Sequence, residues 1–214
     1  MSKIKVNEIA KHDASEITIS DTIKIDTIAE KTSAAGVTID GVLLKDGQVD
    51  GVDVSAITTG KILQVVSTAS DVAASNNGSS YTSVLATTIT PSATSSKVLI
   101  LVSAHFSMST DTYGGATLLR GGTEIHKSTA TTGGGNANQY SVPINNRSGD
   151  AGWEARTISI NHLDSPNTTS ATTYALGFRK DYGSQLMFNR PYYTNNAAYH
   201  WNVVSELVLM EVGV

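Results

Sequence analysis

The feature that most constrains this chain is a series of short apolar runs, separated by clusters of turn-forming residues, from residue 61 to the C-terminus. The runs are rich in Val, Ile, Leu and Thr, and β-branched residues of this kind fit a pleated strand. The clusters between them, such as SNNGSS, TPSATSS and DSPNTTSA, contain the residues that supply turns. The pattern predicts ten strands: Lys61–Ser67, Thr82–Ile89, Lys97–Phe106, Ala116–Arg120, Thr123–His126, Gln139–Ile144, Arg156–Leu163, Thr172–Arg179, Gln185–Asn189 and Val203–Val212.

Two of these runs indicate how the strands pack. The run KVLILVSAHFSM is first continuously apolar and then alternates, as expected of a central strand in a packed sheet. The run SELVLMEV alternates and closes the chain. Only 16% of the 214 residues are charged, which is too few for a typical disordered chain. Residues 61–214 are therefore predicted to form an all-β, jelly-roll-like β-sandwich.

Residues 1–60 differ in composition from the rest of the chain. They are richer in charge than the rest, contain no aromatic residue, and carry β-branched pairs spaced two residues apart, which places both members on one face of a strand. Asp-Gly pairs at 40–41, 46–47 and 50–51 predict turns between very short strands. A short helix over residues 25–35 (IDTIAEKTSAA) is a second interpretation of part of this segment.

Such isolated apolar residues cannot form a stable core within one short segment. We expect them to pack against the same segment of sister chains in an intertwined β shaft, which also covers the strand edges. The alternative is a small β module that folds onto the C-terminal domain. The residues expected to pack in a trimeric shaft are Ile17, Ile19, Ile23, Ile25, Val37, Ile39, Val42, Leu44, Val49, Val52 and Val54.

Composition argues against several functional classes. A net charge of −4 and a pI near 5.7 argue against a nucleic-acid partner. The chain has no cysteine, so disulfides do not stabilise it. No stretch approaches 18 apolar residues, and the N-terminal MSKIKVNEIAKHD lacks the apolar core of a signal peptide. Neither membrane insertion nor export through a signal peptide is expected.

Several stretches of the chain resemble a known family. The segment TIAEKTSAAGVTIDGVLLKDGQVDGVDVS is similar to one that recurs in structural proteins of marine and cyanobacterial tailed bacteriophages, particularly their tail fibre, or receptor-binding fibre, proteins. The stretches KILQVVST, ITPSATSSKVLILVSAHF, LLRGGTEI, HLDSPNTTSATTYALGF and SELVLMEV resemble the knob domain of such fibres. The resemblance implies a homotrimer whose N-terminal part anchors on the virion and whose knob projects outward.

This resemblance divides the chain into a virion-anchoring and shaft segment at 1–60 and a receptor-binding knob at 61–214. The anchor would dock on a tail, baseplate or other virion protein, where the alternating Ile4 and Val6 can add to a sheet edge. Its candidate residues are Lys3, Ile4, Val6 and Ile9. The expected location is the virion tail, after assembly in the host cytoplasm.

Enzymatic motifs are not apparent in the sequence. It contains no GxSxG, HExxH, CxxC or P-loop pattern, and the glycine-rich TGGGNAN is interpreted as a loop between strands. A polysaccharide-cleaving fibre would need two positioned carboxylates. The candidates are Asp150, Glu154, Asp164 and Asp181, each beside a turn signal.

The histidines do not show metal-ligand spacing in the sequence. They are His12, His105, His126, His162 and His200. Three copies of one histidine around a trimer axis would be the alternative arrangement for an ion site. No metal site and no cofactor are expected, and the chain is not expected to be an enzyme.

Aromatic residues concentrate in DYGSQLMFNRPYYTNNAAYHW. Phe188 and Trp201 are expected in the core, whereas the tyrosines lie either in a recognition surface or in a cleft between subunits. Aromatic faces stack on sugar rings, and amides between them can bond the hydroxyls. The candidate receptor-binding residues are Tyr182, Tyr192, Tyr193, Asn195, Asn196, Asn136 and Asn138, from the loops at 129–138 and 181–200.

Three functions are compatible with this sequence. The leading one is a tail fibre that attaches the virion to the host cell surface by binding a glycan or a surface protein. The second is a head fibre or capsid decoration protein, and the third is a tail-borne glycan hydrolase.

Overall fold

The computed structural model describes the backbone of residues 37–39, 42–45, 48–49 and 52–53, and then residues 60–129, 138–146, 151–195, 198 and 200–214. The chain divides into two units, Met1–Ile57 and Thr58–Val214. The helix considered over residues 25–35 lies outside the described residues, as do the candidate anchor and shaft residues Lys3, Ile4, Val6, Ile9, Ile17, Ile19, Ile23, Ile25 and Val54.

The first unit contains four very short strands. They are β1 (Val37–Ile39), β2 (Val42–Lys45), β3 (Gln48–Val49) and β4 (Val52–Asp53). Each pairs antiparallel with the next. The three Asp-Gly pairs that were predicted to form turns lie between these strands in the sequence, outside the described residues. Six predicted shaft residues therefore lie in strands: Val37, Ile39, Val42, Leu44, Val49 and Val52. Their packing against sister chains stays a prediction.

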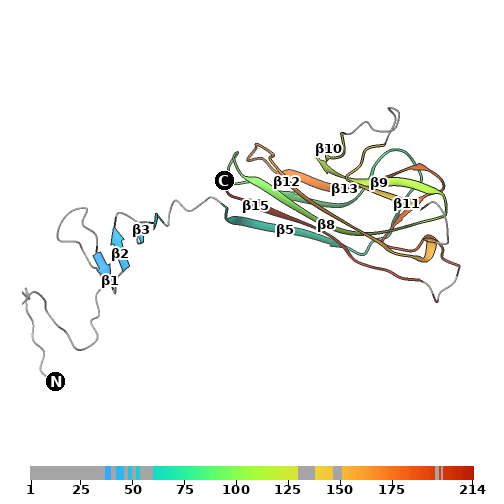
Figure 1. The fold of residues 1–214 in the computed structure, drawn as a ribbon, viewed down its shortest axis with the longest axis horizontal. Coiled ribbons are helices and arrows are strands. Elements are labelled where there is room, and N and C mark those ends of the chain that lie inside the picture. The colour runs from blue at the N-terminus through green and yellow to red at the C-terminus, as the bar shows by residue number, and fades with distance from the viewer. Residues whose placement is uncertain are drawn as a thin grey trace, which may run out of the picture. The chain divides into compact units, whose positions relative to one another are not determined.

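The second unit is built from strands and one described 3₁₀ turn. The strands are β5 (Ile62–Ser70), β6 (Ala74–Asn76), β7 (Thr82–Ile89), β8 (Lys97–Met108), β9 (Thr112–Arg120), β10 (Thr123–His126), β11 (Val142–Asn146), β12 (Arg156–Asp164), β13 (Thr172–Tyr182), β14 (Leu186–Phe188) and β15 (Ser205–Val212), and the turn is η1 (Ala151–Trp153). All ten predicted strands are present, and β6 is an additional one. Figure 1 shows the long strands running lengthwise through this unit.

The strands form two antiparallel sheets. In the first, called here the β8 sheet, the long strands are ordered β5-β15-β8-β12, and β14 and β6 continue along the edge of β8 beyond β15. In the second, called the β9 sheet, the order is β7-β13-β9-β11, and β10 pairs with the same edge of β9 as β11. The predicted all-β architecture is therefore confirmed, with two sheets compatible with a β-sandwich.

Apolar side chains from both sheets form one core. Along β8, buried Val98, Ile100 and Val102 alternate with less buried neighbours, which is the pattern of a strand with one face inward. The β9 sheet contributes Leu85, Leu118, Tyr174, Leu176 and Phe178 to the same cluster. The predicted core residue Phe188 is fully buried, and its ring centroid lies 5.5 Å from that of Phe106.

The two ends of the sandwich differ. The chain enters at Gly60, whose backbone N–H donates to the Gly213 carbonyl at 2.6 Å, so the first and last strands meet at this proximal end. Strand β8 begins there and runs to the opposite, distal end, where the turn at 109–111 leads into β9. Strand β9 then returns to the proximal end and turns at Gly121 and Gly122. Both have positive φ, as a two-residue hairpin turn requires.

Candidate functional site

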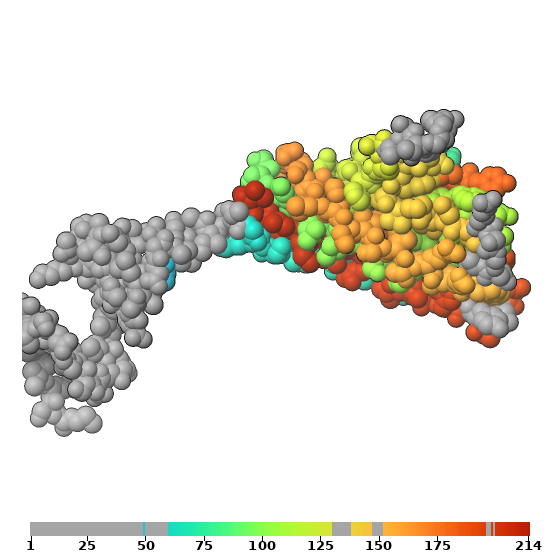
Figure 2. Space-filling model, viewed as in Figure 1, coloured from blue at the N-terminus to red at the C-terminus, as the bar shows by residue number. Residues whose placement is uncertain are grey.

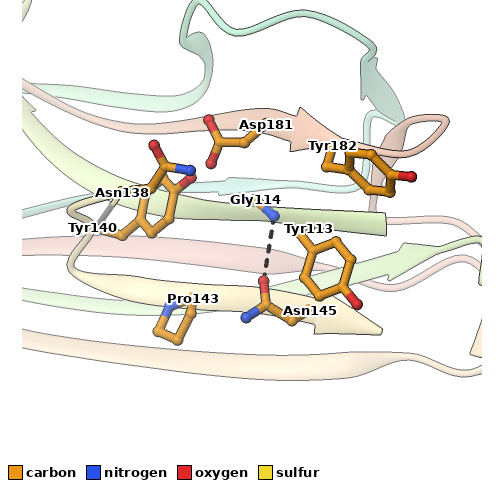
Figure 3. A pocket seen from close by; sticks show the side chains of 8 residues that line it. All are labelled: Tyr113, Gly114, Asn138, Tyr140, Pro143, Asn145, Asp181 and Tyr182. Carbon is orange, nitrogen blue, oxygen red and sulfur yellow. Dashed lines mark hydrogen bonds between the residues drawn. The ribbon is translucent and has the colours of Figure 1, made fainter. Parts of the chain in front are cut away.

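One hollow of the described surface lies on the outer face of the β9 sheet, toward its distal end. Pro143 and Asn145 of β11 flank the buried Ile144 and therefore point outward. Across the sheet, the register places Tyr113 of β9 opposite both Asn145 and Tyr182. Together with Gly114, Asn138, Tyr140 and Asp181, these residues line a pocket of about 440 Å³ (Figure 3). We call it the tyrosine pocket.

Gly115, one of two adjacent glycines in β9, makes room for the pocket. A Cβ on Gly115 would lie 2.2 Å from the ring of Tyr140, so this ring can lie flat on the sheet only over a residue without a side chain. A Cβ on the neighbouring Gly114 would instead meet the Arg179 carbonyl at 2.2 Å and the buried Leu186 side chain at 2.9 Å, so this glycine faces the core. The Asn145 amide lies over the Gly114 backbone, whose N–H is 3.3 Å from its Oδ1. In the opposite amide orientation, the nitrogen donates to the carbonyls of Gly114 and Ile144.

Three tyrosine rings form the sides of the pocket. Tyr113 and Tyr182 pack against one another with ring centroids 5.8 Å apart, and Tyr140 lies on the opposite side (Figure 3). The Tyr182 residue is 65% exposed, which is unusual for so large an aromatic residue. The pocket thus offers aromatic faces to solvent, and such faces can stack on a flat apolar ring.

Polar groups converge on the same pocket. Asn138 and Asn145 bring amides, and Asp181 brings a carboxylate whose Oδ1 lies 3.3 Å from the Arg179 Nε. The Arg179 guanidinium lies between two rings, 5.0 Å from the centroid of Tyr81 and 5.2 Å from that of Tyr140. Burial raises the pKa of Asp181. The arrangement can therefore both donate hydrogen bonds to hydroxyl groups and accept them.

This combination of groups can bind a small polar molecule. Stacking rings with a few positioned amides and one carboxylate are typical of recognition surfaces. Glycoside hydrolysis ordinarily uses two carboxylates flanking the scissile bond. Of the described lining residues of the tyrosine pocket, one is a carboxylate, Asp181.

The predicted receptor residues fall into two places. Tyr182 and Asn138 line the tyrosine pocket. Tyr192 and Tyr193 lie elsewhere, in the loop after β14, where the backbone N–H groups of both donate to the Gly152 carbonyl at 2.8 and 3.2 Å. Asn195 is an exposed residue of that loop, whereas Asn136 and Asn196 lie outside the described residues.

The Tyr192–Tyr193 loop is held by aromatic packing. The Tyr193 ring lies 5.3 Å from Trp153 and meets Tyr192 edge to face at 5.0 Å. The Trp201 indole N–H donates to the Trp153 carbonyl at 2.7 Å. Trp201 is half-buried and fastens this loop rather than filling the central core. Both tyrosines are also half-buried, so their rings contribute to packing as well as to the surface.

The carboxylates considered for catalysis are dispersed. Asp164 is buried, and its Oδ2 accepts from the Arg120 guanidinium at 2.7 Å and from the Tyr174 hydroxyl at 2.6 Å. Glu154 is exposed, and Asp150 lies outside the described residues. Of the three that are described, Asp181 lies in the tyrosine pocket.

The described histidines do not form a metal site within the single chain. His126 and His162 stack with ring centroids 4.6 Å apart, and burial followed by the charge of His126 lowers the pKa of His162. His105 Nδ1 lies 2.9 Å from the Thr157 hydroxyl. Within the described ranges, no group of three or more His, Cys, Asp or Glu side chains could hold a metal ion.

Sequence reasoning missed Tyr113, Tyr140 and Asn145 as pocket residues. Pro143, Ile144 and Asn145 alternate in direction along the strand, and Ile144 faces inward. The outward direction of Asn145 was therefore predictable once the predicted strand was extended by two residues. Tyr113 precedes two glycines, which weaken a strand prediction. The Gly-Gly pair was itself the available signal, because a glycine inside a strand often marks close approach of another group.

Neither a protein-family model nor a curated protein matches the chain. No helix in the described part of the chain is long and apolar enough to span a membrane.

Proposed function

We propose that this chain is the tail fibre of a tailed bacteriophage and attaches the virion to its host by binding a glycan, or a surface protein, with its C-terminal sandwich. The observation that carries the proposal is the tyrosine pocket at the distal end of the β9 sheet. Its rings can stack on a sugar face while Asn138, Asn145 and Asp181 bond the hydroxyls. The residues that resemble fibre proteins supply the phage context.

The order of the strands supports a jelly-roll interpretation of the sandwich. Counting the eight main strands from β5 to β15 without β6, β10 and β14, the sheets read 1-8-3-6 and 2-7-4-5. This is the arrangement of two Greek keys rolled into two sheets, which occurs in viral capsid and lectin domains. A lectin-like role is thus compatible with the architecture, although the site and not the fold carries the argument.

The division of the chain supports an anchored fibre. The unit Met1–Ile57 is separate from the sandwich and contains strands of two to four residues, which are marginal by themselves. Association of three chains along this segment would bury its apolar residues, and its N-terminal end would dock on a virion protein. The pocket lies at the sandwich end farthest from where the chain enters, as attachment to a cell surface requires.

Binding to host cells by single-tyrosine variants tests the proposal. Tyr182→Ala removes a stacking face from the pocket and should weaken glycan binding at one sandwich about five- to tenfold. Avidity across several sandwiches would make the loss of adsorption steeper. Glycan affinity is measured by calorimetry on the purified protein, and adsorption is measured with fluorescent protein on host cells.

Tyr192→Ala is the matched variant in the neighbouring loop. Unchanged binding by Tyr192→Ala together with weakened binding by Tyr182→Ala supports the pocket. The reverse result would move the receptor contacts to the loop after β14, which carries Tyr192 and Tyr193. Normal adsorption by both variants would contradict receptor binding by either surface.

The same sandwich and the same tyrosine pocket are compatible with the alternative, a head fibre or capsid decoration protein. Gold-labelled antibody against the sandwich on intact particles separates the two, since tail labelling is expected for the proposed function and shell labelling for the alternative. Release of reducing ends from host polysaccharide would instead favour the hydrolase.

A further inference from the structure

The outer face of the β8 sheet is apolar at the proximal end. The strand register places four large apolar residues in one row across all four long strands: Met210 is opposite Val65 on one side and Leu99 on the other, and Leu99 is opposite Leu163. All four alternate with inward-facing residues such as Ile100 and Leu209, so they point away from the core.

The apolar character fades toward the distal end. The second row is Ser67, Val208, Leu101 and Asn161, with its two apolar residues in the centre. The third row is Ala69, Glu206, Ser103 and Ser159, which is small and polar. We call the six large apolar residues of the first two rows the proximal patch: Val65, Leu99, Leu101, Leu163, Val208 and Met210.

The described chain leaves this patch uncovered. Val65 is 55% exposed and Leu163 is 48% exposed, and the four residues between them are half-buried by one another. In Figure 2 the start of β5 (teal) and the end of β15 (red) are neighbours at the proximal end of the surface. A contiguous apolar area on a sheet, bordered by polar residues, is typical of an interaction site.

We propose that the proximal patch packs against a second copy of this chain and forms the contact between sandwiches in the fibre. The position of the patch favours this occupant. The chain enters the sandwich at Gly60, and Val65 follows in the first half of β5, so the patch lies close to this point of entry. Copies associated along residues 1–57 would enter their sandwiches side by side and bring these surfaces together.

The chemistry of the patch also favours a copy of the same chain. Neither of its two rows contains a charged side chain, and charged residues lie only at its borders: Lys97, opposite Val212, on the proximal side, and Glu206 in the third row. Permanent interfaces between identical subunits are more apolar than the interfaces of transient partners, which carry more polar and charged groups. A permanent contact between copies matches this composition.

The patch and the tyrosine pocket lie on opposite sheets. The patch is on the outer face of the β8 sheet at the proximal end, and the pocket is on the outer face of the β9 sheet toward the distal end. Association through the patch therefore leaves the pocket open to solvent in every copy. The inference rests on the self-association included in the proposed function, but not on receptor binding.

Sedimentation of the full-length protein tests the contact. Val65→Lys combined with Leu163→Lys places two charges in the patch at exposed positions, so the isolated sandwich keeps its core. The double variant should raise the concentration at which the assembly dissociates by about tenfold or more. Val204→Lys is the matched control, because Val204 is 58% exposed but lies outside the patch. Equal dissociation of the double variant, the control and the original chain would overturn the inference.

A labelling experiment does not depend on the fold tolerating two new charges. Because the chain has no cysteine, Val65→Cys and Val204→Cys each introduce a single thiol at a similarly exposed valine. In the full-length assembly, a bulky maleimide should react several-fold more slowly at position 65 than at position 204, and dilution should remove the difference. Equal rates in the assembly, or a full-length chain that is monomeric, would overturn the inference.

These outcomes separate the inference from the proposed function. If position 65 is protected from the maleimide but the protein does not adsorb to host cells, the contact between sandwiches is supported and receptor binding is contradicted. If the protein adsorbs through the tyrosine pocket but position 65 is not protected from the maleimide, receptor binding is supported and the contact between sandwiches is contradicted.

Discussion

At the scale of single residues, Glu211 shows how the sandwich holds a charge in its interior. The residue is 1% exposed, and its carboxylate accepts hydrogen bonds from the Gln64 amide at 2.6 Å and from the Ser92 backbone N–H at 2.7 Å. The Ser92 hydroxyl donates a further bond at 2.6 Å. Burial by itself raises the pKa of Glu211, but the bonds from Gln64, Ser92 and Ser96 outweigh it and lower the pKa to about 2.

Because of Glu211, the free energy of unfolding should decrease at acidic pH. Its folded-state pKa lies below its ordinary value of 4.5, so its contribution is fully present above about pH 4.5 and is lost as the pH falls toward 2. The lowered pKa corresponds to a contribution of roughly 3 kcal/mol to the free energy of unfolding. Urea unfolding at fixed protein concentration should show a smaller loss of stability between pH 5 and pH 2 in Glu211→Gln than in the original chain. Glu206→Gln, on the outward face of the same strand, should keep the original pH dependence. If Glu211→Gln lost as much stability between pH 5 and pH 2 as the original chain, the proposed role of the Glu211 carboxylate would be contradicted.

At the scale of elements, one polar cluster connects the two sheets near the proximal end. Asp164 ends β12 of the β8 sheet, and it accepts from Arg120 of β9 and from Tyr174 of β13. Burial, together with the bond to the Asp164 carboxylate, raises the pKa of Tyr174 well above its ordinary value. The cluster thus gives a specific partner to polar groups that the core would otherwise leave unpaired.

Replacing the carboxylate should loosen the connection between the sheets. Asp164→Asn keeps the shape but removes the charge that both partners bond, and we expect it to lower the free energy of unfolding by about 1–3 kcal/mol. Asp71→Asn makes the same change at an exposed position and should alter stability much less. Urea denaturation of both variants measures the difference. Equal effects would mean that the cluster contributes no more than a surface acid.

At the scale of the whole molecule, the two units are expected to play different parts. The sandwich has its own core, with apolar residues from both sheets in a single cluster. The first unit has strands of two to four residues and lacks aromatic side chains. The sandwich is therefore expected to fold by itself, whereas the first unit is expected to need association with other chains.

Removal of the first unit tests this division. A fragment of residues 61–214 should remain β-rich by circular dichroism, because its core is complete. It should assemble more weakly than the full chain, since it keeps the proximal patch but loses the segment predicted to bring copies together. Sedimentation over a range of concentrations measures both proteins. A fragment that assembles as tightly as the full chain would assign all of the association to the sandwich.

The sequence by itself determined the class of the fold and most of its strands. Local composition was sufficient, because short β-branched runs between turn clusters can hardly form any other element. The limits of the strands were less predictable. Strand β9 was expected to begin at Ala116 because glycines disfavour strands, but it begins at Thr112, where the neighbouring strands supply hydrogen bonds regardless of the side chain. Strand β6 was missed because it is held by distant groups, such as the Asn76 amide that donates to the Phe178 carbonyl at 2.7 Å.

The tyrosine pocket and the proximal patch were decided by the tertiary structure alone. Tyr113, Tyr140, Asn145 and Tyr182 are dispersed over 70 positions of the sequence. The register of β9 with β11 and β13 brings Tyr113, Asn145 and Tyr182 together, and Tyr140 lies over Gly115 of β9. The first row of the patch likewise draws one residue from each of four strands. Alternation along a strand tells which residues share a face, but a surface feature needs the neighbours of that strand, and pairing between distant strands is not encoded in any local pattern.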